Sequence, residues 1–388
     1  MTTVLLDVPV RDGAPAPAIP AADELPLEAI PAGPIAQVRA ERVAALDGLR
    51  GLMAWAVALY HFGLLTHAFR GAATLSSVVT VLGLHSVEAF FMVSGFCLFH
   101  LHGEMGRSRT ELRRFYLQRF LRLAPVFYLV LALNFALQEQ AGPPLSWHTF
   151  LENVTFTFGL HHPNHALVTG GWSIGLEVMF YASFPFLAAL FRSPVALAVG
   201  ALAAIGLAWS YSANDVESAA DAARFNAYVL MQNHAFAFLV GGLIAKLRPL
   251  VVARIALPLA CALLGTCAVF WIRSHPLVID HFEVVLGLRR AQYVAAAALC
   301  VALAACTHVA STRLRVMLER FGELSYPVYL LHPLAWVLCR GWLPSGTSPA
   351  TCVAAAILTT LVLAVTTTRF LERPVRRVFT AAWLEKRT

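Results

Sequence analysis

The chain contains a series of long apolar runs, and these constrain its fold more than any other feature. Each run is long enough to cross a hydrocarbon core of about 30 Å. Inside lipid these runs must be helices, because an isolated strand would leave its backbone groups without hydrogen bonds. We therefore predict an all-α polytopic membrane protein with about ten transmembrane helices. The runs lie near residues 49–68, 76–101, 121–138, 171–191, 194–212, 225–247, 250–272, 291–310, 322–340 and 350–370.

The composition supports membrane insertion and argues against other classes. Hydrophobic residues make up 59% of the chain and charged residues only 13%, whereas soluble proteins average about 45–50% and about 25%. The net charge of +7 fits the positive charge that polytopic proteins keep on the cytoplasmic side, so no nucleic-acid partner is expected. The seven cysteines lie in apolar stretches without metal-ligand spacing, so no metal site is expected either.

The sequence divides into three parts. Residues 1–43 are rich in Ala and Pro and are predicted to form a disordered arm, residues 44–377 a transmembrane domain, and residues 378–388 a short basic tail. No apolar run precedes residue 44, so no cleavable signal peptide is expected. Placing the N-terminus in the cytoplasm leaves most Lys and Arg residues on the cytoplasmic side. We therefore expect a protein of the inner (plasma) membrane with both termini cytoplasmic.

Two residues of the first predicted span point to a ligand. In "LDGLRGLMAWAVALYHF" Arg50 and His61 are eleven residues apart, so they share one helix face at about 16 Å of rise. A histidine inside a span suggests function, although a bond to a neighbouring helix is an equally good explanation. A cation with an imidazole half a bilayer deeper suits a long ligand with an anionic head, such as a coenzyme A thioester. Arg119 and Arg122, at i and i+3, could bind its phosphates or lipid headgroups.

The second predicted span contains an acidic residue within "HSVEAFFMVSGF". Glu88 could accept a hydrogen bond from the ring N–H of His61 and fix its tautomer, as a carboxylate does in hydrolase triads. It could equally clamp two helices together, and the sequence leaves both explanations open. Gly95 in the same run is predicted to let two helices approach closely.

Further polar residues are candidates for binding the acceptor of a group transfer. Glu177 lies about 8 Å inside the outer end of its predicted helix and could bind a hydroxyl or a proton. Trp172 could anchor the helix at the interface or stack on a sugar, and Ser173 follows it directly. Ser325 and His332 are seven residues apart on one helix face, where they could contact acceptor, support the site indirectly or bond between helices.

The segment 139–170 is too long for a simple turn and is a candidate lid or acceptor-binding element. It contains "HHPNH" at 161–165. The proline interrupts helical spacing and we expect no partner carboxylate nearby, so a polar loop that could contact substrate is favoured over a metal site.

Taken together, the motifs resemble the acyltransferase 3 family of membrane O-acyltransferases over residues 44 to about 377. They occur in family order: "LDGLRG" to "YHF", "VEAFFMVSGF", "RFLR", "GWSIGLEVMFY", "LSYPVYLLHP" and "FLERPVRR". The resemblance implies transfer of an acyl group, commonly acetyl, from cytoplasmic acyl-CoA such as acetyl-CoA to a hydroxyl. The implied acceptors are carbohydrates of the cell envelope: surface polysaccharide, lipid-linked sugar or lipo-oligosaccharide.

Matching these motifs to the family assigns roles to individual residues. His61 would be the essential histidine, and Glu88 the acidic residue before the aromatic pair. Arg50, Arg119 and Arg122 would bind the donor. The rival interpretation is a proton-coupled secondary transporter in which His and Glu relay protons. Such transporters often contain paired broken helices from internal repeats, and the sequence has no such pairing.

Overall fold

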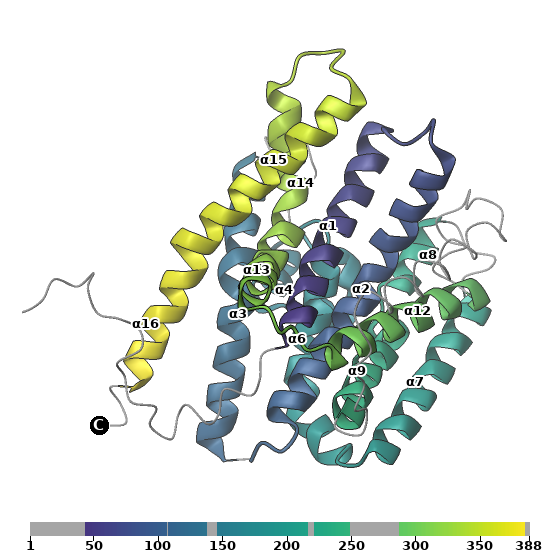
Figure 1. Ribbon diagram of the computed structural model, residues 1–388, viewed down its shortest axis with the longest axis vertical. Helices are drawn as coiled ribbons and strands as arrows, with labels where there is room; N and C mark the ends of the chain where they lie inside the picture. The colour runs from purple at the N-terminus through teal and green to yellow at the C-terminus, as the bar shows by residue number, and fades with distance from the viewer. Residues whose placement is uncertain (1–42, 107, 138–145, 216–220, 249–286, 385–388) are drawn as a thin grey trace, which may run out of the picture. The chain divides into compact units, whose positions relative to one another are not determined.

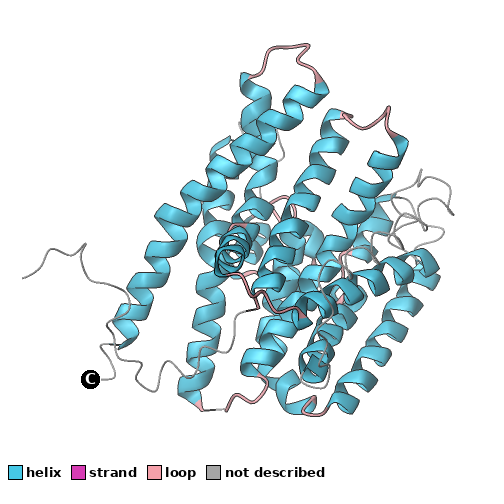
Figure 2. Ribbon diagram, viewed as in Figure 1, coloured by secondary structure: helices cyan, strands magenta, loops and turns pink. Residues whose placement is uncertain are grey.

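The structure is a computed structural model that describes residues 43–106, 108–137, 146–215, 221–248 and 287–384 (Figure 1). All regular elements among these residues are helices, which confirms the predicted all-α class (Figure 2). The predicted arm, up to residue 42, and the predicted span at 250–272 lie outside the described residues. Residues 43–388 form one unit by their contacts.

Five helices among the described residues are long and apolar enough to cross a membrane. The first four are α1 (Ala44–Thr66), α2 (Ala73–His102), α3 (Arg109–Leu137) and α6 (Gly171–Leu190). The fifth is a continuous rod made of α15 (Pro349–Thr367), the π-helical turn η5 (Thr368–Glu372) and α16 (Arg373–Leu384).

The other helices are shorter or less apolar, so the predicted count of about ten spans is not confirmed. Those expected to span are α7 (Pro194–Asp215), α9 (Ala235–Leu247), α12 (Gly287–Cys306) and α14 (Ser325–Trp342). Short apolar stretches occur in α7, α9 and α12. The connecting helices are α4 (Trp147–Thr155), α5 (Phe158–His161), η2 (Pro163–His165), α8 (Asp221–Tyr228), η3 (Met231–Asn233) and α13 (Thr312–Glu323).

Serine side chains fix where three of these helices begin. Ser146, Ser311 and Ser348 precede α4, α13 and α15, and each hydroxyl accepts a hydrogen bond from the backbone N–H three residues later. This bond satisfies one of the N–H groups that a helix leaves without a partner at its start. Pro349 follows Ser348 at the first helical position, where no N–H is needed.

Helix α2 lies at the centre of the bundle and packs against α1, α9 and α12 (Figure 1). Its crossing with α9 is so close that a Cβ atom at Gly95 would overlap the carbonyl oxygen of Phe238. A Cβ atom at Gly241, on α9, would overlap the carbonyl oxygen of Met92. The prediction that Gly95 permits close helix approach is therefore confirmed, and small residues hold this crossing together as in other membrane bundles.

We expect Gly95→Ala to destabilise the protein by about 1–3 kcal/mol, because overpacking outweighs the gain in helix propensity. Gly206→Ala is the matched control, since a Cβ atom there meets nothing within 4 Å; it should leave stability unchanged or raise it. The thermal midpoints in detergent measure both effects. Equal midpoints for the two variants would show that the crossing has room for a methyl group.

Candidate functional site

A cavity of about 60 Å³ lies where α1, α2, α3, α6 and α14 meet. Three arginines from two helices are part of its wall: Arg50 from α1, and Arg119 and Arg122 from α3. Helical spacing places Arg119 and Arg122 on one face of α3, and the packing of the helices adds Arg50 of α1 to the same wall. Three further predicted residues also line this cavity, namely Ser173, Glu177 and Ser325.

The arginines in this wall are poorly matched by negative charge. The Nε atoms of Arg119 and Arg122 are buried and have no hydrogen-bond partner in the part of the chain that the structure describes. Arg119 donates from Nη2 to Nε2 of His102 at 3.2 Å, and Arg50 pairs with Asp47 at 3.6 Å. A buried guanidinium without a partner is costly, because its hydration is lost and not replaced. The wall is therefore suited to an anionic ligand.

Among the described residues that line the cavity, Glu177 is the one with a carboxylate side chain. Its Oε1 atom accepts a hydrogen bond from Ser94 Oγ at 3.2 Å and a second from the hydroxyl of Tyr181. Two hydroxyl donors, rather than an arginine, therefore hold this carboxylate. The ring of Tyr181 in turn lies 5.7 Å from the guanidinium carbon of Arg119.

A small hydroxyl cluster forms another part of the cavity wall. Ser173 Oγ lies 2.8 Å from the hydroxyl of Tyr329, and both groups donate to the carbonyl oxygen of Gly170, at 3.0 Å and 3.2 Å. Gly170 has a φ of 76°, a left-handed conformation that glycine adopts without strain. The ring of Phe90, which also lines the cavity, packs edge-on against Tyr329 at 5.9 Å.

His61 and His332 form a separate pair. His332 Nε2 lies 3.1 Å from His61 Nδ1, and the two rings are stacked with centroids 5.0 Å apart. His332 is 1% exposed, and its ring lies 6.2 Å from the ring of Tyr329. Neither histidine is among the described residues that line the cavity. The arginines and the histidines are thus separate, with Tyr329 beside both.

Of the two explanations left open for Glu88, the structure contradicts the hydrogen bond to His61 and shows the clamp between helices. Glu88 is fully buried and pairs instead with Nε of Arg290 on α12 at 3.3 Å, while Nδ1 of His85 lies 3.5 Å away. Arg290 also donates from Nη2 to the carbonyl oxygen of Asn233 at 2.6 Å. A guanidinium is preferred over a neutral imidazole because the charged pair compensates for the buried carboxylate. The contacts of Glu88 are those of a helix clamp.

Trp172 lies outside the cavity wall as well. Its ring is half-buried and contacts the rings of Tyr228 and His234 at 5.5 Å and 5.3 Å. Arg290 lies 5.6 Å from the same Tyr228 ring. Trp172 is therefore near the Glu88–Arg290 pair, although its neighbour Ser173 lines the cavity.

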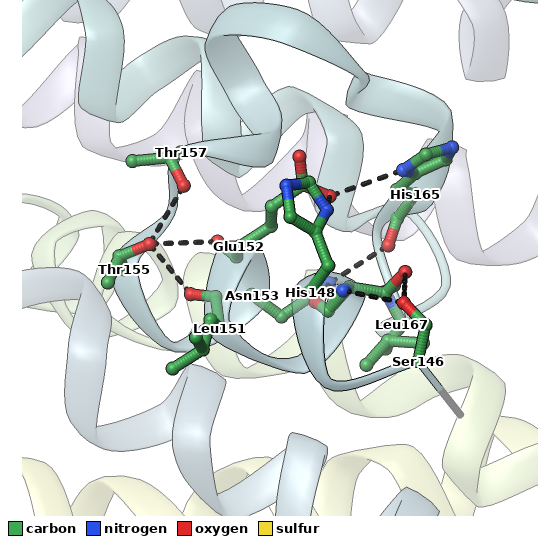
Figure 3. A network of polar contacts seen from close by, with 10 residues as sticks. Ser146, His148, Leu151, Glu152, Asn153, Thr155, Thr157, His165 and Leu167 are labelled. Carbon is green, nitrogen blue, oxygen red and sulfur yellow. Dashed lines mark hydrogen bonds and ion pairs between the residues drawn. The ribbon is translucent and has the colours of Figure 1, made fainter. Parts of the chain in front are cut away.

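The candidate lid folds into a closed polar network, shown in Figure 3. Glu152 is buried, with Nδ1 of His165 at 3.2 Å and Nδ1 of His148 at 3.6 Å. Asn153 accepts from the backbone N–H of Leu167 and donates to the carbonyl oxygen of His165, both at 2.9 Å. The described part of this segment is therefore held by polar contacts and consists largely of the short helices α4, α5 and η2. The expectation that no carboxylate lies near the motif at 161–165 is wrong, because Glu152 contacts His165.

Sequence reasoning missed four residues of these clusters. Tyr329 could have been found, because it precedes His332 by three residues and follows Ser325 by four, which places it on the same helix face. Tyr181 could have been found in the same way, because it follows Glu177 by four residues on α6. Arg290 and His102 gave no such signal, since their partners come from other helices.

Membrane-length helices around a cavity that carries excess positive charge define a membrane protein suited to an anionic ligand. The sequence profile of the acyltransferase 3 family, described as an acyltransferase domain, matches residues 43–369. The chain therefore belongs to this family and is a membrane acyltransferase. No curated protein and no solved structure matched the chain.

We expect Glu88→Gln to lower stability by about 3 kcal/mol or more, because it leaves the guanidinium of Arg290 buried without its carboxylate. Adding Arg290→Gln should recover much of the loss, since the two amides can bond each other. Thermal midpoints in detergent check this, with Arg313→Gln on exposed α13 as the control for lost charge. A double variant no more stable than Glu88→Gln alone would refute the clamp.

Proposed function

We propose that the chain is an O-acyltransferase that moves an acyl group, foremost acetyl, from acyl-CoA to a hydroxyl of a carbohydrate-type acceptor. Family membership supports the reaction class. The observation that carries the donor assignment is the pair of buried Nε atoms of Arg119 and Arg122, which have no hydrogen-bond partner among the described residues. Guanidinium groups bind phosphates through paired donors, and coenzyme A carries its phosphates at the end opposite the thioester.

The donor would lie with its phosphates at Arg50, Arg119 and Arg122 and its thioester arm directed along α1 toward His61. The length of α1 between Arg50 and His61, about 16 Å of rise, suits a pantetheine arm. A cavity of about 60 Å³ has space for a few water molecules only. Donor binding therefore requires the side chains of Phe90 and Tyr329, which line the cavity, to move apart.

His61 would act on the acyl group at the far end of the donor. In one route it takes the proton of the acceptor hydroxyl while that oxygen attacks the thioester carbonyl, and it returns the proton to the departing thiolate of coenzyme A. In the other route the imidazole attacks the carbonyl itself, releases coenzyme A and then passes the acyl group to the hydroxyl. Both routes exchange a thioester for an ester without any further reactant. Glu88, paired with Arg290, has no chemical role in either.

We propose a surface polysaccharide, lipid-linked sugar or lipo-oligosaccharide as the acceptor. Ser173 and Ser325 line the cavity, and their hydroxyls donate to the backbone carbonyls of Gly170 and Gly322. We also propose the inner (plasma) membrane, with both termini cytoplasmic. This orientation follows the distribution of Lys and Arg and puts the start of α1, with Arg50, on the side that contains acyl-CoA. Family membership favours this transferase over a proton-coupled transporter.

Acetyl-CoA should protect the protein against thermal unfolding, by about 2.7 kcal/mol at a concentration one hundred times its dissociation constant. Arg122→Gln should weaken binding about ten-fold or more, because charge-assisted hydrogen bonds to phosphate are lost. Arg313→Gln is the control for charge, and S-acetylpantetheine, which lacks the phosphates, is the control ligand. Equal protection of the wild type and Arg122→Gln by acetyl-CoA would contradict the donor site.

His61→Ala should abolish O-acetylation of the native glycan, because neither route proceeds without the imidazole. The readout is the O-acetyl signal in NMR spectra of glycan isolated from cells that produce the wild type or the variant, at matched protein levels. His67→Ala, just past the end of α1 on an exposed turn, is the control. An unchanged signal in His61→Ala would defeat the assignment.

A further inference from the structure

The contacts of the two histidines determine which ring nitrogens carry hydrogens. Nδ1 of His61 lies 3.0 Å from the carbonyl oxygen of Val57, and Nδ1 of His332 lies 3.3 Å from that of Val328. A carbonyl oxygen only accepts hydrogen bonds, so both Nδ1 atoms are assigned as donors. In a neutral imidazole the other nitrogen is then the acceptor. The Nε2 atom of His332 therefore presents a lone pair.

That lone pair faces His61. Since Nδ1–H of His61 is 3.1 Å from Nε2 of His332, this hydrogen is shared between His332 and the Val57 carbonyl. The Nε2 atom of His61 is left as an acceptor, and it makes no hydrogen bond within the described residues. His61 is half-buried whereas His332 is buried, so the outer ring is accessible and the inner ring is fixed.

We propose that His332 is the positioning residue for His61. It receives the Nδ1–H bond, holds the ring so that Nε2 is the reactive atom, and stabilises the imidazolium that forms when Nε2 takes a proton. This is the role that a carboxylate plays in a hydrolase triad, performed here by a neutral imidazole. The inference rests on the proposed function, because it assigns the support of the histidine that the function uses.

The surroundings of His332 favour this role over contact with the acceptor. Its ring is 1% exposed and is enclosed by the ring of Phe62, edge-on at 6.0 Å, and by that of Tyr329 at 6.2 Å. Pro333 follows it within α14. Proline has no N–H, so the backbone carbonyl of Tyr329, four residues earlier, receives no helical hydrogen bond from Pro333.

A pair of amide substitutions separates positioning from packing. In His332→Gln the amide oxygen can occupy the place of Nε2 and accept from His61, whereas the shorter side chain of His332→Asn places its amide near Nδ1. We expect His332→Ala and His332→Asn to lower the maximal O-acetylation rate in isolated membranes about 10- to 100-fold, with the KM for acetyl-CoA unchanged. His332→Gln should recover most of the rate. Val337→Ala, on the exposed face of α14, is the control.

A second measurement does not depend on the acceptor. The rate at which diethyl pyrocarbonate modifies His61, read by mass spectrometry of its peptide, reports the nucleophilicity of Nε2. We expect it to fall in His332→Ala and His332→Asn and to recover in His332→Gln. An unchanged rate in all three would overturn the proposal, as would equal loss of O-acetylation in Gln, Asn and Ala. If His61→Ala retains full O-acetylation, the proposed function fails instead.

Discussion

The cost of removing polar groups from water governs the interior of this protein. In lipid and in a packed core, an ionisable side chain must find a partner or carry a large desolvation penalty. Glu88 forms an ion pair with Nε of Arg290 at 3.3 Å, and Nδ1 of His61 lies 3.1 Å from Nε2 of His332. The Nε atoms of Arg119 and Arg122 have no hydrogen-bond partner among the described residues. These two atoms belong to residues that line a cavity, so a ligand in that cavity could supply the missing partners.

Close helix packing is what brings these pairs together. Gly95 and Gly241 allow α2 to cross α9 with backbone in contact, and α2 then also contacts α1 and α12. Glu88 and the cavity residue Ser94 both belong to this one helix, so the crossing sets the position of the clamp and of the cavity wall together. A shift of α2 would therefore disturb the ion pair and the donor site at once.

Helical spacing in the sequence predicts which residues share one face of a helix. It does not predict which residues of two different helices contact each other. Arg119 and Arg122 share a face because they are three residues apart, and this holds in any α-helix. The partner of Glu88 lies 202 residues away and that of His61 lies 271 residues away. Periodicity contains no information about such pairs, so the sequence could not decide whether Glu88 contacts His61 or clamps two helices. The structure shows the contact with Arg290 instead.

The ring of Tyr329 lies between the arginine cavity and the histidine pair in the chain of contacts. Tyr329 lines the cavity and also lies 6.2 Å from the ring of His332, and Ser173 and Gly170 hold its hydroxyl. A donor that reaches from Arg50 to His61 must displace this ring and exchange its hydrogen bonds. The hydroxyl bonds lost would be few and neutral, each worth about 1 kcal/mol, whereas phosphates at the three arginines would satisfy buried charged donors. Under the proposed function, donor binding at the arginines would thus compensate for displacing the Tyr329 ring.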